Sequence, residues 1–323
     1  MPMERWKPRT GAGGHATGVL RVAAFTFFVT ACVGRSEARH DESQVPAQQA
    51  VELAPGLVSN GHRFMVALTP DGSTLYTVER RFPSPGAPPD LVIFEATRDA
   101  RGEWSAPDTA SFSGRWSDID PAFAPGGQRL WFNSSRPAPD RDSARTDFDI
   151  WYLDREGEGW GTPQRLPEPV NTTGSEFFAT STRDGTLYFT VSRRAPVRRS
   201  FIVRSRPVAE GRWSAPDTVR IGTEPLADAS NPFIAPDESW LVFVSERPGG
   251  FGDADLYLSE RVGAGWSAPR NLGKGVNSAL SEFAPSVSED GSTLFFTRMR
   301  RGADRNAVEE RLFSIPMAAV RGR

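Results

Sequence analysis

The chain repeats one sequence unit five times. Each copy contains an apolar run, a turn of the Pro-Asp-Gly type, and a second apolar run that is followed by arginine. The turn position recurs at spacings of 53 to 58 residues, at Asp71, Gly126, Asp184, Asp237 and Asp290. A second marker, Trp-Ser-Ala-Pro or Trp-Gly-Thr-Pro, keeps this period and starts at Trp104, Trp160, Trp213 and Trp266. Two markers with one period indicate a repeat architecture.

Each unit is expected to form four β-strands. Gly after the turn accepts a positive φ where the chain reverses, and the second run alternates as a half-buried strand does, for example over 187–191. Four-stranded antiparallel units at this period are typical of propeller blades. The sequence therefore predicts an all-β protein, a β-propeller of five four-stranded blades over residues 51–320, with six blades as the alternative.

The last unit lacks the strand that begins with tryptophan. Residues 51–58 precede the first unit and have the character of that missing outer strand. We therefore expect the N-terminal strand to pair within the last blade, which closes the ring and removes a free sheet edge.

The repeat resembles those of TolB-like and WD40-like propellers of the bacterial envelope. The resemblance rests on the Pro-Asp-Gly turn, the Leu-Tyr-Phe strand, the Ser-Arg-Pro that follows it and the later Asp-Ile-Trp or Asp-Leu-Tyr strand. It covers about residues 51 to 320 and implies a propeller fold and protein partners in the periplasm or outer membrane.

The N-terminus has the order of a secretory signal over residues 1–31. Basic residues precede an uncharged stretch at 22–31, which at ten residues is too short to span a bilayer as a helix. The stretch ends Val-Thr-Ala before Cys32 and resembles a lipobox, which implies acyl chains, among them palmitate, on that cysteine. Residues 32–50 read as a flexible polar tether and 321–323 as a tail. We expect a lipid-anchored protein of the cell envelope, most simply on the periplasmic face of the outer membrane.

Composition excludes several classes of function. The formal net charge is −2 and the body of the chain has no block of basic residues, so nucleic acid is not an expected partner. The one cysteine excludes a Cys-based zinc cluster, and the three histidines supply no His-based triad. No cofactor is expected, although a divalent cation at the channel mouth stays an alternative.

Polar residues recur where the inner strands are expected to begin. If the inner strands line a central channel, these side chains converge at one mouth and form a candidate ligand site. The candidates are Asp118, Asp120, Glu176, Asn231 and Glu282, with Trp116 as a stacking surface. Carboxylates in such a site could hold a cation or act as an acid and base pair in glycoside hydrolysis, as in five-bladed hydrolases. They could equally cap local backbone amides.

Arginines also recur, four residues after an aromatic residue of the second strand. We interpret them as structural clasps to acids at the start of the third strand, because paired arginines suit fixed bidentate geometry. The arginines are Arg80, Arg136, Arg193, Arg247 and Arg300, and the acids are Asp90, Asp149 and Asp255. The repeated tryptophans are expected to fill space between blades.

These observations favour a non-enzymatic propeller that binds or scaffolds an envelope protein and carries no catalytic residues. The alternative hypothesis is a carbohydrate-binding or glycoside-hydrolysing propeller with an acidic site in the central channel.

Overall fold

The computed structural model describes residues 48–84, 89–138, 147–193, 199–221, 224–302 and 307–322. The expected signal at 1–31, Cys32 and nearly all of the expected tether lie outside the described residues. The propeller forms one compact unit of the chain. In the described part of the chain, no helix is both long and apolar enough to cross a membrane.

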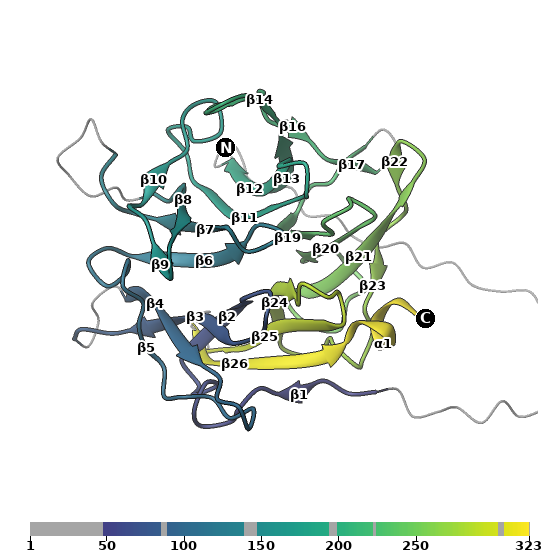
Figure 1. The fold of residues 1–323 in the computed structure, drawn as a ribbon. Coiled ribbons are helices and arrows are strands. Elements are labelled where there is room, and N and C mark those ends of the chain that lie inside the picture. Colours follow the sequence, from purple (N-terminus) through teal and green to yellow (C-terminus); the bar gives the residue numbers. More distant parts are fainter. Residues whose placement is uncertain are drawn as a thin grey trace, which may run out of the picture. The chain divides into compact units, whose positions relative to one another are not determined.

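Five antiparallel sheets form the blades of a β-propeller, which confirms the predicted fold class (Figure 1). The innermost strands are β2 (Arg63–Leu68), β6 (Asp118–Phe123), β11 (Glu176–Ser181), β19 (Ala229–Ile234) and β24 (Ser281–Val287). The second strands are β3 (Thr74–Arg81), β7 (Arg129–Ser134), β12 (Leu187–Arg193), β20 (Trp240–Ser245) and β25 (Thr293–Arg301).

The third strands are β4 (Asp90–Thr97), β8 (Asp149–Glu156), β13 (Arg199–Ser205), β21 (Asp255–Val262) and β26 (Ala307–Pro316). The short outer strands are β5 (Asp108–Thr109), β10 (Gln164–Arg165), β16 (Asp217–Thr218), β23 (Arg270–Asn271) and β1 (Val51–Glu52). Further short strands are β9 (Gly159–Trp160), β14 (Pro207–Ala209), β15 (Arg212–Trp213), β17 (Arg220–Ile221), β18 (Glu224–Pro225) and β22 (Gly265–Trp266). A short helix, α1 (Met317–Arg321), follows β26.

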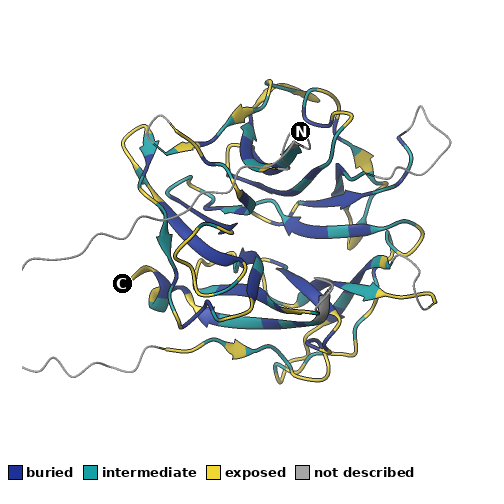
Figure 2. Cartoon of the chain, turned by 180° about the vertical axis from the view of Figure 1, so that it is seen from behind, coloured by how far each residue is buried: buried dark blue, intermediate teal, exposed yellow. Residues whose placement is uncertain are grey.

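The expected turns join the inner strand to the second strand. In the first blade the Asp71 carboxylate accepts hydrogen bonds from the Thr69 and Ser73 hydroxyls, which lower its pKa to about 2. Gly72 beside it has φ +69°, a conformation that glycine adopts without strain. Buried side chains follow the strands, and the turns are largely exposed (Figure 2).

The repeated tryptophans pack between neighbouring blades, as predicted. The Trp160 indole N–H donates to the Tyr76 hydroxyl of the preceding blade at 3.0 Å. Trp213 meets Trp131 of its preceding blade edge to face, with ring centroids 6.3 Å apart. Trp104 packs near Phe295 of the last blade. The repeat period is therefore the period of the blade interfaces.

Every innermost strand contains a bulge at the same position. The register with the second strand shifts by one residue in all five blades, and the bulged residue has a φ of +48° to +64°. These residues are Met65, Asp120, Phe178, Asn231 and Ala284. Residues other than glycine rarely adopt such a φ, and the bulge re-aims a side chain that strict alternation would place elsewhere.

The ring closes as the sequence predicts. β1 pairs with β26 through Val51 opposite Ser314 and Glu52 opposite Phe313, so the N-terminal strand is the outer strand of the last blade. The Glu52 carboxylate also accepts from Arg311 at 2.8 Å, which adds an ion pair across the closure.

Replacing Leu53 with proline tests this closure. The Leu53 amide donates to the Leu312 carbonyl at 2.9 Å, and proline has no amide hydrogen. We expect Leu53→Pro to lower the free energy of unfolding by about 1 to 3 kcal/mol, measured by chemical denaturation. Gln48→Pro, on the exposed segment before β1, is the control and should leave it unchanged. Equal stability of both variants would contradict closure by β1.

Candidate functional site

Two adjoining hollows lie at the end of the channel where the inner strands begin. One has a volume of about 770 Å³ and is lined by the third, fourth and fifth blades. The other, of about 390 Å³, is lined by the fourth, fifth and first blades. They share Ser230, Asn231, Val244, Glu246 and Arg301, so we treat them together as the mouth cavity. Hollows of this size are in the range of ligand sites.

Asn231 is the predicted site residue that lines the mouth cavity. It occupies the bulge of β19 with φ +48°, and its backbone amide donates to the Thr190 hydroxyl of the neighbouring blade at 3.0 Å. The bulge and this bond fix its backbone at the channel wall. The half-buried amide side chain offers both a donor and an acceptor to a ligand.

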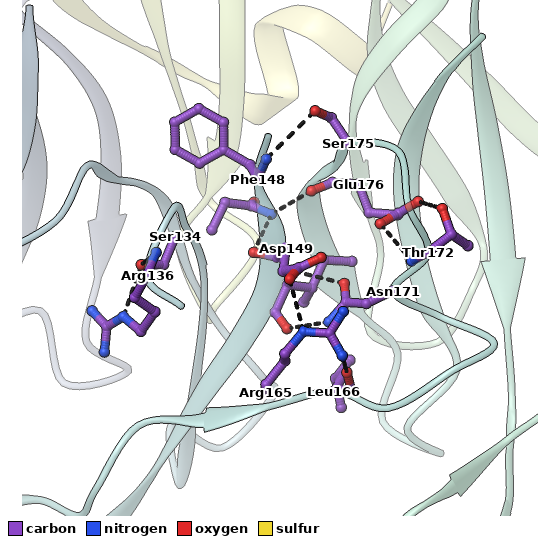
Figure 3. Close-up of polar contacts among 12 residues, drawn as sticks. Ser134, Arg136, Phe148, Asp149, Arg165, Leu166, Asn171, Thr172, Ser175 and Glu176 are labelled. Carbon is purple, nitrogen blue, oxygen red and sulfur yellow. Dashed lines mark hydrogen bonds and ion pairs between the residues drawn. The ribbon is translucent and has the colours of Figure 1, made fainter. Parts of the chain in front are cut away.

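Asp118, Glu176 and Glu282 occupy one equivalent strand position, but the structure does not bring their carboxylates to the mouth. All three are buried, and each carboxylate accepts hydrogen bonds from nearby side chains of the protein. The Glu176 carboxylate accepts from the Thr172 hydroxyl at 2.6 Å and from the Thr172 amide at 3.0 Å, and Figure 3 shows it turned toward that residue. Glu282 accepts from Ser278 in the same way.

The capping alternative describes Glu176 and Glu282, which accept from backbone amides, although Glu282 also pairs with Arg298. Asp118 instead accepts from Arg136 and from the Ser113 hydroxyl, and the expected acidic mouth is wrong. A carboxylate at the start of a buried strand must be hydrogen-bonded, and the residue four positions earlier supplies its bond in the third and fifth blades. Arginines and acids instead share the mouth, namely Arg80, Arg247 and Arg301 with Asp228, Glu246 and Glu310.

Asp120 differs from the other three acids. It occupies the bulge of β6, is only 7% exposed, and has the Phe178 backbone amide as its polar neighbour. Burial raises the pKa of this carboxyl from 3.8 to about 7. Asp120 and Asn231 hold the same bulge position in two blades, so the repeat places them at one level of the channel wall. A carboxyl that keeps its proton near neutral pH can act as a general acid.

Trp116 lies outside the mouth cavity. Its half-buried ring packs under the Arg115 guanidinium, 5.2 Å from the ring centroid, on the segment that leads into β6. No group of three or more His, Cys, Asp or Glu side chains within the described residues is placed to hold a metal ion.

The arginines make contacts, but the predicted clasp partners are wrong. Arg136 pairs with Asp118 of the inner strand at 2.7 Å and Arg80 pairs with Glu310 of the last blade at 3.0 Å. Arg247 contacts the Ser245 hydroxyl at 3.0 Å. Arg80, Arg136 and Arg247 each place the guanidinium over an aromatic ring of their own blade. The expected acids are bonded elsewhere, since Asp149 pairs with Arg165 and Asp255 accepts from Asn271.

The acids of the expected clasps have other partners. Asp149 pairs with Arg165 of the outer strand at 2.7 Å, as Figure 3 shows. Asp255 accepts from the Asn271 side chain at 2.7 Å, and Asp90 is exposed. Arg300 pairs with Glu309 at 3.2 Å. The side chain of Arg193 lies outside the described residues.

Sequence reasoning missed Glu246 and Arg301 as cavity residues. Both lie directly beside a repeated arginine, Glu246 before Arg247 and Arg301 after Arg300. The first unit has the same residue types at these positions, Glu79 and Arg81, so the repeat offers no signal that separates the two cavity residues from the framework.

Comparison with solved structures supports the propeller fold. A structure named as a glycoside hydrolase matches with a TM-score of 0.55 and 10% identity over 83% of this chain and 91% of that chain. A BT0996 RGII complex matches with a TM-score of 0.55 and 11% identity over the same shares. An α-L-arabinofuranosidase from Lactobacillus brevis matches with a TM-score of 0.50 and 12% identity over 82% of this chain and 92% of that one. No family model and no curated protein matches the chain.

These likenesses correct two predictions. The five-bladed propeller is confirmed, but the neighbours are propellers of the glycoside hydrolase kind and not TolB-like or WD40-like proteins. The prediction of a non-enzymatic scaffold for an envelope protein is contradicted by the same neighbours, which favour the carbohydrate alternative. At these identities the likeness establishes the fold, so the activity must be argued from the site.

Proposed function

We propose that this propeller binds a carbohydrate in the mouth cavity and hydrolyses a glycosidic bond there, with Asp120 as the proton donor. The observation that carries the proposal is a buried carboxyl, with a pKa of about 7, in the bulge of β6, the position at which β19 holds the cavity residue Asn231. The glycoside hydrolase propellers of similar fold support this choice of reaction.

The mouth cavity has the lining that a saccharide requires. Hydroxyl and amide groups of Ser200, Ser230, Asn231 and Ser245 face a volume of about 770 Å³. Such groups exchange hydrogen bonds with sugar hydroxyls and fix the orientation of the ring. This polar lining fits a ligand that is itself covered with hydroxyls.

Hydrolysis needs two carboxyl groups. In the proposed step Asp120 gives its proton to the leaving glycosidic oxygen as the bond to the anomeric carbon breaks, and water adds to that carbon. Glu246 is exposed and lines both hollows, so it is the candidate for the carboxylate that takes the proton from water.

The test is a screen of purified protein for reducing ends released from plant and bacterial polysaccharides, with binding followed by affinity electrophoresis. We expect retardation on at least one polysaccharide and release of reducing ends from it. Binding without release would leave a carbohydrate-binding protein and remove the catalytic role of Asp120. Failure to bind any neutral or acidic polysaccharide would contradict the proposal as a whole.

We also keep the lipid anchor at Cys32 and an envelope location as part of the proposal. They rest on the lipobox-like sequence alone.

A further inference from the structure

Arg136 and Arg247 occupy equivalent positions in the second and fourth blades. The Nε of Arg136 donates to the Ser134 hydroxyl at 2.7 Å, and the Nε of Arg247 donates to the Ser245 hydroxyl at 3.0 Å. Each guanidinium also lies over two rings of its own blade, at 4.8 to 5.5 Å from their centroids. The rings are Phe132 and Trp151 for the first, and Phe243 and Tyr257 for the second. The two arginines therefore point the same way within their blades.

Their carboxylate partners differ. Arg136 pairs with Asp118, which stands opposite Ser134 in the register of the inner and second strands. In the fourth blade the residue opposite Ser245 is Ala229. The residues equivalent to Ala229 are charged and buried in all four other blades, namely Arg63, Asp118, Glu176 and Glu282. The fourth blade therefore has a small apolar residue where the second blade has the carboxylate that its arginine meets.

Arg247 consequently has no ion pair within the described residues. Asp228, the acid whose charge raises the pKa of Arg247, is bonded twice to Arg199, at 3.1 and 2.8 Å. Burial lowers the pKa of Arg247, and the charge of Asp228 opposes this only in part. A half-buried guanidinium without a carboxylate gains more from an incoming anion than an exposed one does, because water screens the new pair less.

Arg247 lines the larger hollow of the mouth cavity together with Asn231 and Arg301. We infer that the saccharide carries a carboxylate, as a uronic acid residue does, and that this carboxylate binds Arg247 where Asp118 binds Arg136. This inference rests on the proposed function, since it names the class of sugar that the mouth cavity takes. The planar guanidinium matches a carboxylate in bidentate geometry, and Asn231 is placed to bond the neighbouring sugar hydroxyls.

The experiment compares acidic saccharides with their neutral methyl esters. Trimers of galacturonate, glucuronate and mannuronate, each with its ester, are titrated into the full chain by calorimetry. We expect at least one acid to bind about 10- to 100-fold more tightly than its ester, the size of a hydrogen-bonded charge contact. Arg247→Met should reduce the acid to the affinity of the ester.

Ala229→Asp is the sharper variant. It gives the fourth blade the carboxylate that Asp118 provides in the second blade. The new carboxylate should pair with Arg247 and abolish the preference for the acid while the protein stays folded. Arg129→Met, which breaks an ion pair with Asp154 at the surface, is the control and should keep the preference.

The outcomes separate the two proposals. Equal affinity for acids and esters in the unaltered protein overturns the uronate inference and leaves carbohydrate binding intact. Binding of neutral oligosaccharides alone does the same. Binding of none of these saccharides overturns both. Inorganic phosphate that binds as tightly as the uronates, and is lost in Arg247→Met, would show a general anion site and overturn the assignment to a sugar.

Discussion

Asp120→Asn should abolish most hydrolysis and, above neutral pH, stabilise the fold. Loss of a general acid lowers kcat by about 10²- to 10⁴-fold, and asparagine has no proton of suitable acidity to give. The unaltered protein should lose activity as pH rises through about 7, because Asp120 acts only while protonated. The variant should lack this alkaline limb. The measurement is a pH profile of kcat on the polysaccharide found in the screen.

The stability effect follows from the same carboxyl. The pKa of Asp120 is about 7 in the folded protein and near 3.8 in the unfolded chain, so the folded state binds the proton more tightly. The stability that depends on the protonated Asp120 carboxyl is fully present below about pH 4 and is lost as pH rises to about 7. Each unit of pKa difference between the folded and unfolded states corresponds to about 1.4 kcal/mol, so ionised Asp120 lowers the free energy of unfolding by about 4 kcal/mol at pH 8.

Asp120→Asn should therefore raise the free energy of unfolding at pH 8 by up to about 4 kcal/mol and change it little at pH 4. Glu176→Gln is the matched control, because that carboxylate is held by Thr172 and has no catalytic part in the proposal. It should keep kcat. An unchanged kcat in Asp120→Asn would remove Asp120 from the reaction, and equal stability at both pH values would show that its carboxyl is solvated.

The fold could be predicted because the repeat itself encodes it. Asp71 and its counterparts mark the turns, Trp160 and its counterparts mark the blade interfaces, and residues 51–58 supply the missing strand. These are local patterns with a fixed period, so five copies reinforce one interpretation. Cys32 and its lipid lie outside the described residues and stay a prediction.

The site could be predicted only in part, because side-chain direction depends on contacts that the period does not contain. Ser134 has Asp118 opposite it on one neighbouring strand and Asp149 on the other, so both acids were within reach of Arg136. Arg165 of the outer strand pairs with Asp149, and Arg136 pairs with Asp118. The sequence predicted that Arg136 pairs with Asp149, but in the structure it pairs with Asp118.

The same limit applies to the acids of the inner strands. Asp118, Glu176 and Glu282 were correctly placed at one strand position, and Asp120 and Asn231 at another. Which of the two positions faces the channel depends on the bulge. The bulged residues share no residue type, so the sequence does not predict their positive φ. The alignment of the units places Ala229 at the position of Asp118. That this leaves Arg247 without a carboxylate partner follows only from the Arg136–Asp118 pair in the structure.

Arg136→Met should lower the free energy of unfolding by about 3 to 5 kcal/mol, because it leaves a buried carboxylate without its ion pair. Asp118 is 0% exposed and accepts from Arg136 at 2.7 Å and from Ser113 at 2.9 Å. Burial already raises the pKa of Asp118 against the attraction of Arg136, so removing the guanidinium leaves desolvation unopposed by its charge. Chemical denaturation at pH 7 measures the loss.

The control for Arg136→Met is Arg129→Met, since Arg129 and Asp154 form an ion pair with the same 2.7 Å separation but are 34% and 42% exposed. Water replaces that partner, and the loss should not exceed about 1 kcal/mol. Acid should rescue the buried variant: once Asp118 takes up a proton it no longer carries a buried charge, so the deficit should shrink between pH 7 and pH 4. Adding Asp118→Asn to Arg136→Met should recover stability at pH 7 for the same reason. A deficit that is equal for both arginines, or that does not change with pH, would show that Arg136 stabilises the blade by packing over its aromatic rings and not by its charge.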